Sequence, residues 1–100
     1  MKIRYTPELL AHMKHRNNHT ILVELVEINH SDVEVADLHV YLPHPRQRRR
    51  FVEDKRYRVV TTEAGEVLLP PYPLELAEEV VFGLKKVLFF HTLTYTGIKL

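Results

Sequence analysis

Arginine is concentrated in one short stretch, PRQRRRF, which places four arginines between Arg46 and Arg50. Guanidinium groups bind phosphate oxygens through paired hydrogen bonds, and neighbouring aromatic rings can stack on exposed bases. Such a stretch can contact several phosphates at once, so its binding would be strongly salt-dependent. One hypothesis is therefore a nucleic-acid-binding module within residues 46–58. Its basic side chains would be Arg46, Arg48, Arg49, Arg50, Lys55, Arg56 and Arg58.

The charge balance around this stretch favours a different interpretation. The isoelectric point of about 8.1 is below the value of about 9 that is typical of a dedicated nucleic-acid-binding domain. Acidic blocks in residues 20–45 and 59–84 flank the stretch, and exposed charge runs are usually solvated or paired. We therefore predict a basic loop over residues 43–56. It would be solvated, or paired within or between chains with the acidic residues Glu24, Glu27, Glu34 or Asp37.

Histidines form a second pattern with chemical potential. The segment HMKHRNNH places His12, His15 and His19 three and four positions apart, and that spacing puts side chains on one face of a helix, where they can chelate a transition metal. The two asparagines before His19 should end the helix, and zinc prefers three or more protein ligands. The sequence therefore favours exposed histidines, with at most a weak metal site at His12 and His15 that folding does not need.

A third pattern could support acid–base chemistry. Asp37, His39 and Tyr41 alternate along an expected strand, so a carboxylate, an imidazole and a phenol would point to the same side. Such a row could orient a general base. It is also the composition of the solvated face of an antiparallel sheet, and the sequence favours this second interpretation over catalysis.

Composition excludes several classes of function. The chain has no cysteine, so disulfides, thiolate metal sites and cysteine nucleophiles are ruled out, and its three glycines are too dispersed for a phosphate-binding loop. The amino-terminal segment contains no signal-peptide pattern, and no apolar run approaches the roughly 20 residues that span a bilayer. These features predict one soluble, cytoplasmic globular domain over residues 1–100, without a cofactor.

The pattern of apolar residues predicts an α+β domain. Strands are expected over residues 1–5, 20–29, 33–42 and 91–100, with two more on either side of a turn at residues 63–66. Helices are expected over residues 6–15 and 73–87. The resulting order is β-α-β-β-β-β-α-β, in a small mixed, mainly antiparallel sheet of five to six strands with two helices packed on it.

These patterns together favour a small non-enzymatic interaction or regulatory domain that forms a homo-oligomer, with a protein partner unknown and no membrane partner. Small domains without disulfides often gain stability by association. Apolar side chains also exceed the needs of one face of a small sheet: Leu22, Val26, Ile28, Phe89 and Phe90. The alternative is a nucleic-acid-binding module using residues 46–58, and the third hypothesis is a small enzyme using Asp37 and His39.

Overall fold

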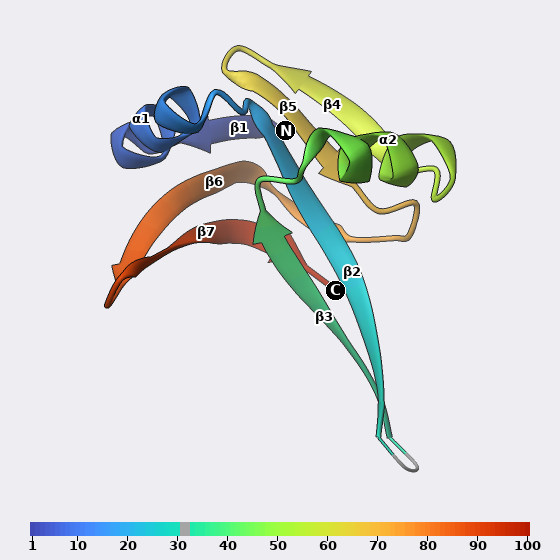
Figure 1. The fold of residues 1–100 in the computed structure, drawn as a ribbon. Helices are drawn as coiled ribbons and strands as arrows, with labels where there is room; N and C mark the ends of the chain where they lie inside the picture. The colour runs from blue at the N-terminus through green and yellow to red at the C-terminus, as the bar shows by residue number, and fades with distance from the viewer. Residues whose placement is uncertain (31–32) are drawn as a thin grey trace.

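The structure of the protein, a computed structural model, describes residues 1–30 and 33–100 (Figure 1). This part of the chain forms two helices and two mixed, mostly antiparallel sheets, which confirms the predicted α+β class. The elements are β1 (Lys2–Tyr5), α1 (Pro7–Arg16), β2 (Thr20–His30), β3 (Val33–Tyr41), α2 (Pro45–Glu53), β4 (Arg58–Thr62), β5 (Gly65–Leu69), β6 (Glu75–Val87) and β7 (Phe90–Lys99).

The strands divide into a three-stranded sheet, β1-β6-β7, and a four-stranded sheet, β3-β2-β5-β4. Each sheet contains one parallel pair, β1 with β6 and β2 with β5, and the other pairs are antiparallel. The two sheets lie in separate layers, with α1 beside β1 and α2 over the four-stranded sheet (Figure 1). Within the described residues, neither helix is long and apolar enough to cross a membrane.

The main core lies between the sheets and is closed by α1. It brings together fully or almost fully buried side chains from α1 and from both sheets. These are Leu9, Met13, Ile21, Val23, Leu38, Val67, Leu69, Val80, Phe82 and Ile98. A smaller cluster on the opposite face of β2 contains Leu22, Phe51, Tyr57 and Leu68. Strand β2 pairs with β3 and, over Thr20–Leu22, with β5, and its residues 21–23 are buried on both faces.

Helix α1 begins and ends within one residue of the predicted bounds, 6–15. The Thr6 side chain accepts a hydrogen bond from the backbone N–H of Leu9, and Pro7 occupies the first turn, where its missing N–H has no cost. The helix ends at Arg16 because Asn17 adopts a left-handed conformation, with φ of 49°. The Asn18 amide then donates to the backbone oxygen of Pro43, 2.8 Å away, which holds the helix end against the segment before α2.

The helix predicted over residues 73–87 is wrong, because residues 75–87 form strand β6. The apolar residues of this segment fit the repeat of a helix, about 3.6 residues, and also the two-residue repeat of a strand. The alternation of Val80, Phe82 and Leu84 places these three side chains on the core face of a strand. Tertiary pairing decides between the two structures, since β6 is hydrogen-bonded to β1 on one side and to β7 on the other. Gly83 allows β7 to approach β6 closely, because a Cβ at this position would lie 2.7 Å from the Thr94 hydroxyl oxygen.

Candidate interaction surfaces

The basic segment predicted as a loop over residues 43–56 is mostly helical, since Pro45–Glu53 forms α2. His44 caps the helix through its ring Nδ1, which accepts a hydrogen bond from the Arg46 N–H, and the Gln47 side chain accepts from the His44 N–H. Pro45 sits in the first turn, where proline favours helix initiation. The predicted loop is therefore wrong over residues 45–53, where Pro45 and the His44 cap begin a helix.

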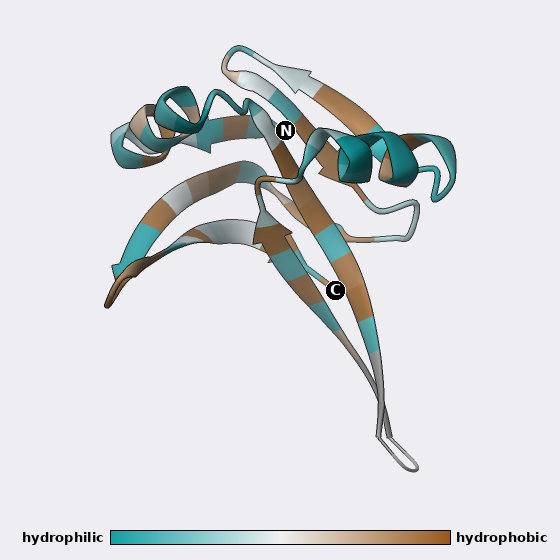
Figure 2. Ribbon diagram, in the orientation of Figure 1, coloured by the Kyte–Doolittle hydropathy of each residue, from teal (hydrophilic) through white to brown (hydrophobic). Residues whose placement is uncertain are grey.

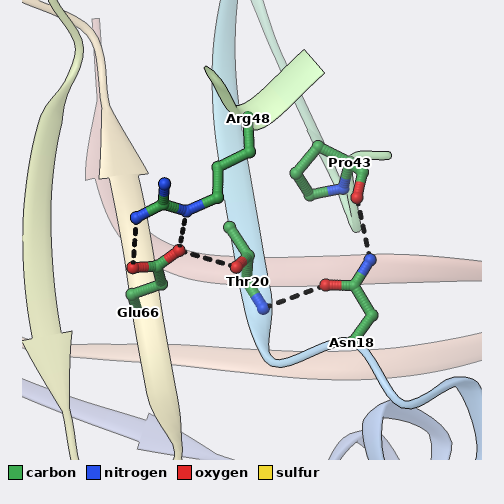
Figure 3. Close-up of polar contacts among 5 residues, drawn as sticks. All are labelled: Asn18, Thr20, Pro43, Arg48 and Glu66. Atoms are coloured by element: carbon green, nitrogen blue, oxygen red, sulfur yellow. Dashed lines mark hydrogen bonds and ion pairs between the residues drawn. The ribbon is translucent and has the colours of Figure 1, made fainter. Parts of the chain in front are cut away.

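One arginine of α2 has a structural role. The Arg48 guanidinium forms two hydrogen bonds with the carboxylate of Glu66 on β5, one of them 2.9 Å long from Nη2 to Oε1 (Figure 3). The Thr20 hydroxyl donates to the same carboxylate at 2.7 Å. The hydrogen bonds from Arg48, followed by the one from Thr20, hold the pKa of Glu66 below its ordinary value despite partial burial. Arg48 therefore attaches α2 to the sheet.

The other arginines of α2 lie on its solvent face. Arg46, Arg49 and Arg50 are exposed and occupy positions i, i+3 and i+4, so they share one side of the helix. Among the side chains that the structure describes, which leave out residues 28–35, none of them has an ion pair to a carboxylate within 4.0 Å. Figure 2 shows α2 as a strongly hydrophilic ribbon. The three side chains form a surface that we call the arginine face.

The acidic residues predicted to pair with these arginines are not seen to do so. The ion pair that forms is between Arg48 and Glu66, and Glu66 was not among the expected partners. Glu24 instead accepts a hydrogen bond from the Tyr41 hydroxyl at 2.6 Å. Glu27 and Asp37 pair with no arginine among the described residues. The side chain of Glu34 lies outside the described part of the structure. Lys55 places its ammonium group 4.3 Å from the centre of the Phe51 ring, and Arg56 and Arg58 are exposed.

The predicted histidine pair is rearranged by the fold. The His12 ring lies against His91 of β7, with ring centres 5.2 Å apart, while His15 is exposed on α1. Burial lowers the pKa of His12, and the nearby His91, Arg16 and His15 lower it further. Among the described residues no three metal-binding side chains form a cluster. Weak metal binding at His12 and His15 stays a prediction.

The row of Asp37, His39 and Tyr41 does not form a tight catalytic group. The His39 Nε2 is 3.8 Å from Asp37 Oδ2, and both side chains are more than half exposed. Asp37 also accepts a hydrogen bond from the backbone N–H of Leu38. Burial, and then the hydrogen bond to Glu24, raise the pKa of the Tyr41 phenol, so its proton is held firmly. The geometry supports the solvated-face interpretation.

The β6–β7 turn presents the most exposed apolar surface of the described residues. Its four consecutive apolar residues, Val87 to Phe90, are 44 %, 80 %, 92 % and 73 % exposed in chain order, and we call them the apolar tip. Figure 2 shows the tip as a hydrophobic end of the projecting hairpin. Phe89 and Phe90 are evident in the sequence as excess apolar residues, but the helix predicted over residues 73–87 hides the turn between two strands. The pattern of two strand-like segments around VLFF is the signal that could have revealed a hairpin.

A comparison with models of protein families, with curated proteins and with solved structures finds no match for this chain. The functional interpretation therefore depends on the surfaces described above.

Proposed function

We propose that the protein is a non-enzymatic interaction domain of the cytoplasm that associates with itself through a surface that includes the apolar tip. The observation that supports this proposal is the exposure of four consecutive apolar side chains, of which Phe89 is 92 % exposed. A monomer that leaves two adjacent phenylalanines in water gains nothing from them in its own core. Contiguous exposed apolar groups on soluble proteins are commonly sites of association.

The other apolar residues in excess on the sequence are largely covered by the chain itself. The prediction of an oligomer was based partly on Leu22 and Val26 of β2, on the assumption that their face needs a cover. Leu22 is fully buried under Phe51 and Val26 is half-buried, so the chain itself covers much of that face. The side chain of Ile28 lies outside the described residues. The apolar tip therefore carries the proposal alone.

The double substitution Phe89→Ser and Phe90→Ser tests this function. We expect the unchanged protein to sediment as a dimer or larger assembly at tens of micromolar, and the variant to shift toward a monomer, because a partner's apolar surface no longer gains by covering the tip. Tyr72→Ser is the matched control, since Tyr72 is 53 % exposed elsewhere. Sedimentation equilibrium distinguishes the three proteins, and a monomeric parent protein at high micromolar concentration contradicts self-association.

A second function, nucleic-acid binding, is favoured by the arginine face. Helix α2 turns three arginines toward solvent from one side, which is a better phosphate-binding geometry than a loop would offer. We expect Arg46→Ala, Arg49→Ala and Arg50→Ala together to weaken binding of mixed-sequence oligonucleotides at low salt. The slope of log K against log salt should flatten by about 0.7–0.9 for each lost phosphate contact.

The control for this experiment removes the same charge from a different surface. Exchanging Lys14, Lys85 and Lys86 for alanine leaves α2 intact, so this variant should keep the affinity of the parent protein if the arginine face is the binding surface. Fluorescence anisotropy with labelled single- and double-stranded oligonucleotides measures the affinity of the arginine variant and of the lysine variant. Equal losses in the two variants would indicate nonspecific attraction, and no binding by the parent protein would exclude this function.

A further inference from the structure

Strand β7 has an open edge without the usual protection. It pairs with β6 on one side and is the last strand of its sheet among the described residues. Residues 90–98 contain no proline and no Lys, Arg, Asp or Glu. The other edge strands carry such charges, for example Arg4 on β1, Asp37 on β3 and Arg58 on β4. Charged residues on an edge strand discourage pairing with another chain. In β7 the one such residue is Lys99, at the end of the strand, so residues 90–98 lack this protection.

The sequence of β7 is also complementary to itself. The segment TLTYT places threonines at 92, 94 and 96, all exposed, and half-buried Leu93 and Tyr95 between them on the core face. When two copies of this segment run antiparallel about Thr94, Thr92 lies opposite Thr96 of the second copy. Leu93 then lies opposite Tyr95. Threonine pairs and aromatic–aliphatic pairs across strands are stabilising, and no like charges meet.

The same alignment accounts for the apolar tip. Pairing about Thr94 brings Phe90, the first residue of β7, opposite Ile98 of the other copy, and places the turn residues Leu88 and Phe89 near Lys99 and Leu100 of that copy. Leu100 is 54 % exposed and can lie near the tip of the second copy. A two-fold axis repeats this contact at both ends of the paired strands. It also uses the open β7 edge of each copy, so this contact closes as a dimer and does not extend.

We propose that two copies of the chain associate by antiparallel pairing of their β7 strands about Thr94, forming one continuous six-stranded sheet. This inference rests on the proposed self-association and specifies its geometry. Backbone hydrogen bonds between the β7 strands provide affinity, and the Thr–Thr, Leu–Tyr and tip contacts define the register.

Because the chain has no cysteine, a single introduced thiol tests the axis. The Thr94→Cys protein should give a covalent dimer on mild oxidation or with a short bismaleimide cross-linker, because the two thiols would face each other across the axis. Thr61→Cys is the control, since Thr61 is also exposed and lies on β4, an edge strand of the other sheet. It should remain monomeric in denaturing gels under the same conditions.

A pair of double variants tests the register without a thiol. Thr92→Lys with Thr96→Lys places like charges opposite each other twice, and should weaken the dimer at least about tenfold. Thr92→Lys with Thr96→Glu places opposite charges there, and should keep the dissociation constant within about threefold of the parent value. Circular dichroism establishes that both variants are folded, and sedimentation velocity measures association.

The outcomes separate the two proposals. A parent protein that is a monomer overturns both. A parent dimer in which Thr94→Cys fails to cross-link, and in which the two charge variants associate equally, overturns β7 pairing alone and leaves self-association through the tip. Cross-linking at Thr94 with unchanged association after substitution of Phe89 and Phe90 supports β7 pairing and removes the tip from the interface.

Discussion

Replacing Phe51 with alanine is expected to lower the free energy of unfolding by about 3–5 kcal/mol, as for other buried phenylalanines. Phe51 is 1 % exposed and is the only buried residue of α2. Its ring meets Tyr57 edge-on, with centres 4.8 Å apart, and packs on Leu22 and Leu68. Alanine would leave a cavity between the helix and the sheet that these neighbours could only partly fill.

Urea denaturation measures this loss, and Val52→Ala is the matched control. Val52 adjoins Phe51 but is only half-buried, so its truncation should cost no more than about 1 kcal/mol. The phenol of Tyr57, which belongs to the same cluster, accepts a hydrogen bond from the Leu25 N–H at 3.1 Å. Equal midpoints for Phe51→Ala and the parent protein would mean that α2 contributes little to the fold.

The second large effect is expected at the ion pair between α2 and β5. Arg48→Ala should lower the free energy of unfolding by about 1–2 kcal/mol, because it leaves the half-buried Glu66 without its bidentate partner. The Arg48 side chain is 41 % exposed, and solvent screening keeps the loss below that of a fully buried pair. Arg49→Ala is the control and should change stability by less than about 0.5 kcal/mol.

Acid should imitate the loss of this ion pair. The folded pKa of Glu66 lies below its unfolded value, so the unfolded chain takes up the proton first as the pH falls. The stability that the pair contributes is complete above the unfolded pKa of about 4.5, and is lost as the pH falls through the folded pKa. The Glu66→Gln variant should therefore show a weaker pH dependence of the urea midpoint between pH 5 and the acid limit. Parallel curves for the two proteins would contradict this role.

Most helices and strands could be predicted because capping residues and apolar patterns within each segment indicate them. Thr6 and Pro7 mark the start of α1, and residues 21–23 of β2 are buried on both faces, as the two-sided apolar pattern indicates. The segment 75–87 was assigned wrongly because its apolar spacing satisfies both a helix and a strand. The decision comes from hydrogen bonds to β1 and β7, which are distant in the chain and cannot be seen in a local pattern.

The candidate surfaces were predictable in composition but not in arrangement. The cluster of arginines is evident in the sequence, yet which of them is bound and which are free depends on how α2 lies on β5. Arg48 meets Glu66, while Arg46, Arg49 and Arg50 turn outward. Similarly, Phe89 and Phe90 were recognised as excess apolar residues. Their exposure follows only from the turn between two strands, one of which was predicted as a helix.

The parallel pairing of β1 with β6 has a consequence for how the chain folds. Lys2 lies opposite Glu79 and Tyr5 opposite Phe82, so the three-stranded sheet joins segments more than 70 positions apart. Closing such a long loop lowers the conformational entropy of the chain before stabilising contacts form. Domains rich in pairings between distant segments therefore fold slowly. During synthesis, β1 must wait for residues 79–82 to emerge, and α1 cannot complete its core contacts with Val80 and Phe82 before then. The β2–β3 hairpin and the β4–β5 hairpin, whose partners are neighbours in the chain, can form earlier and offer the surface on which the three-stranded sheet is assembled last.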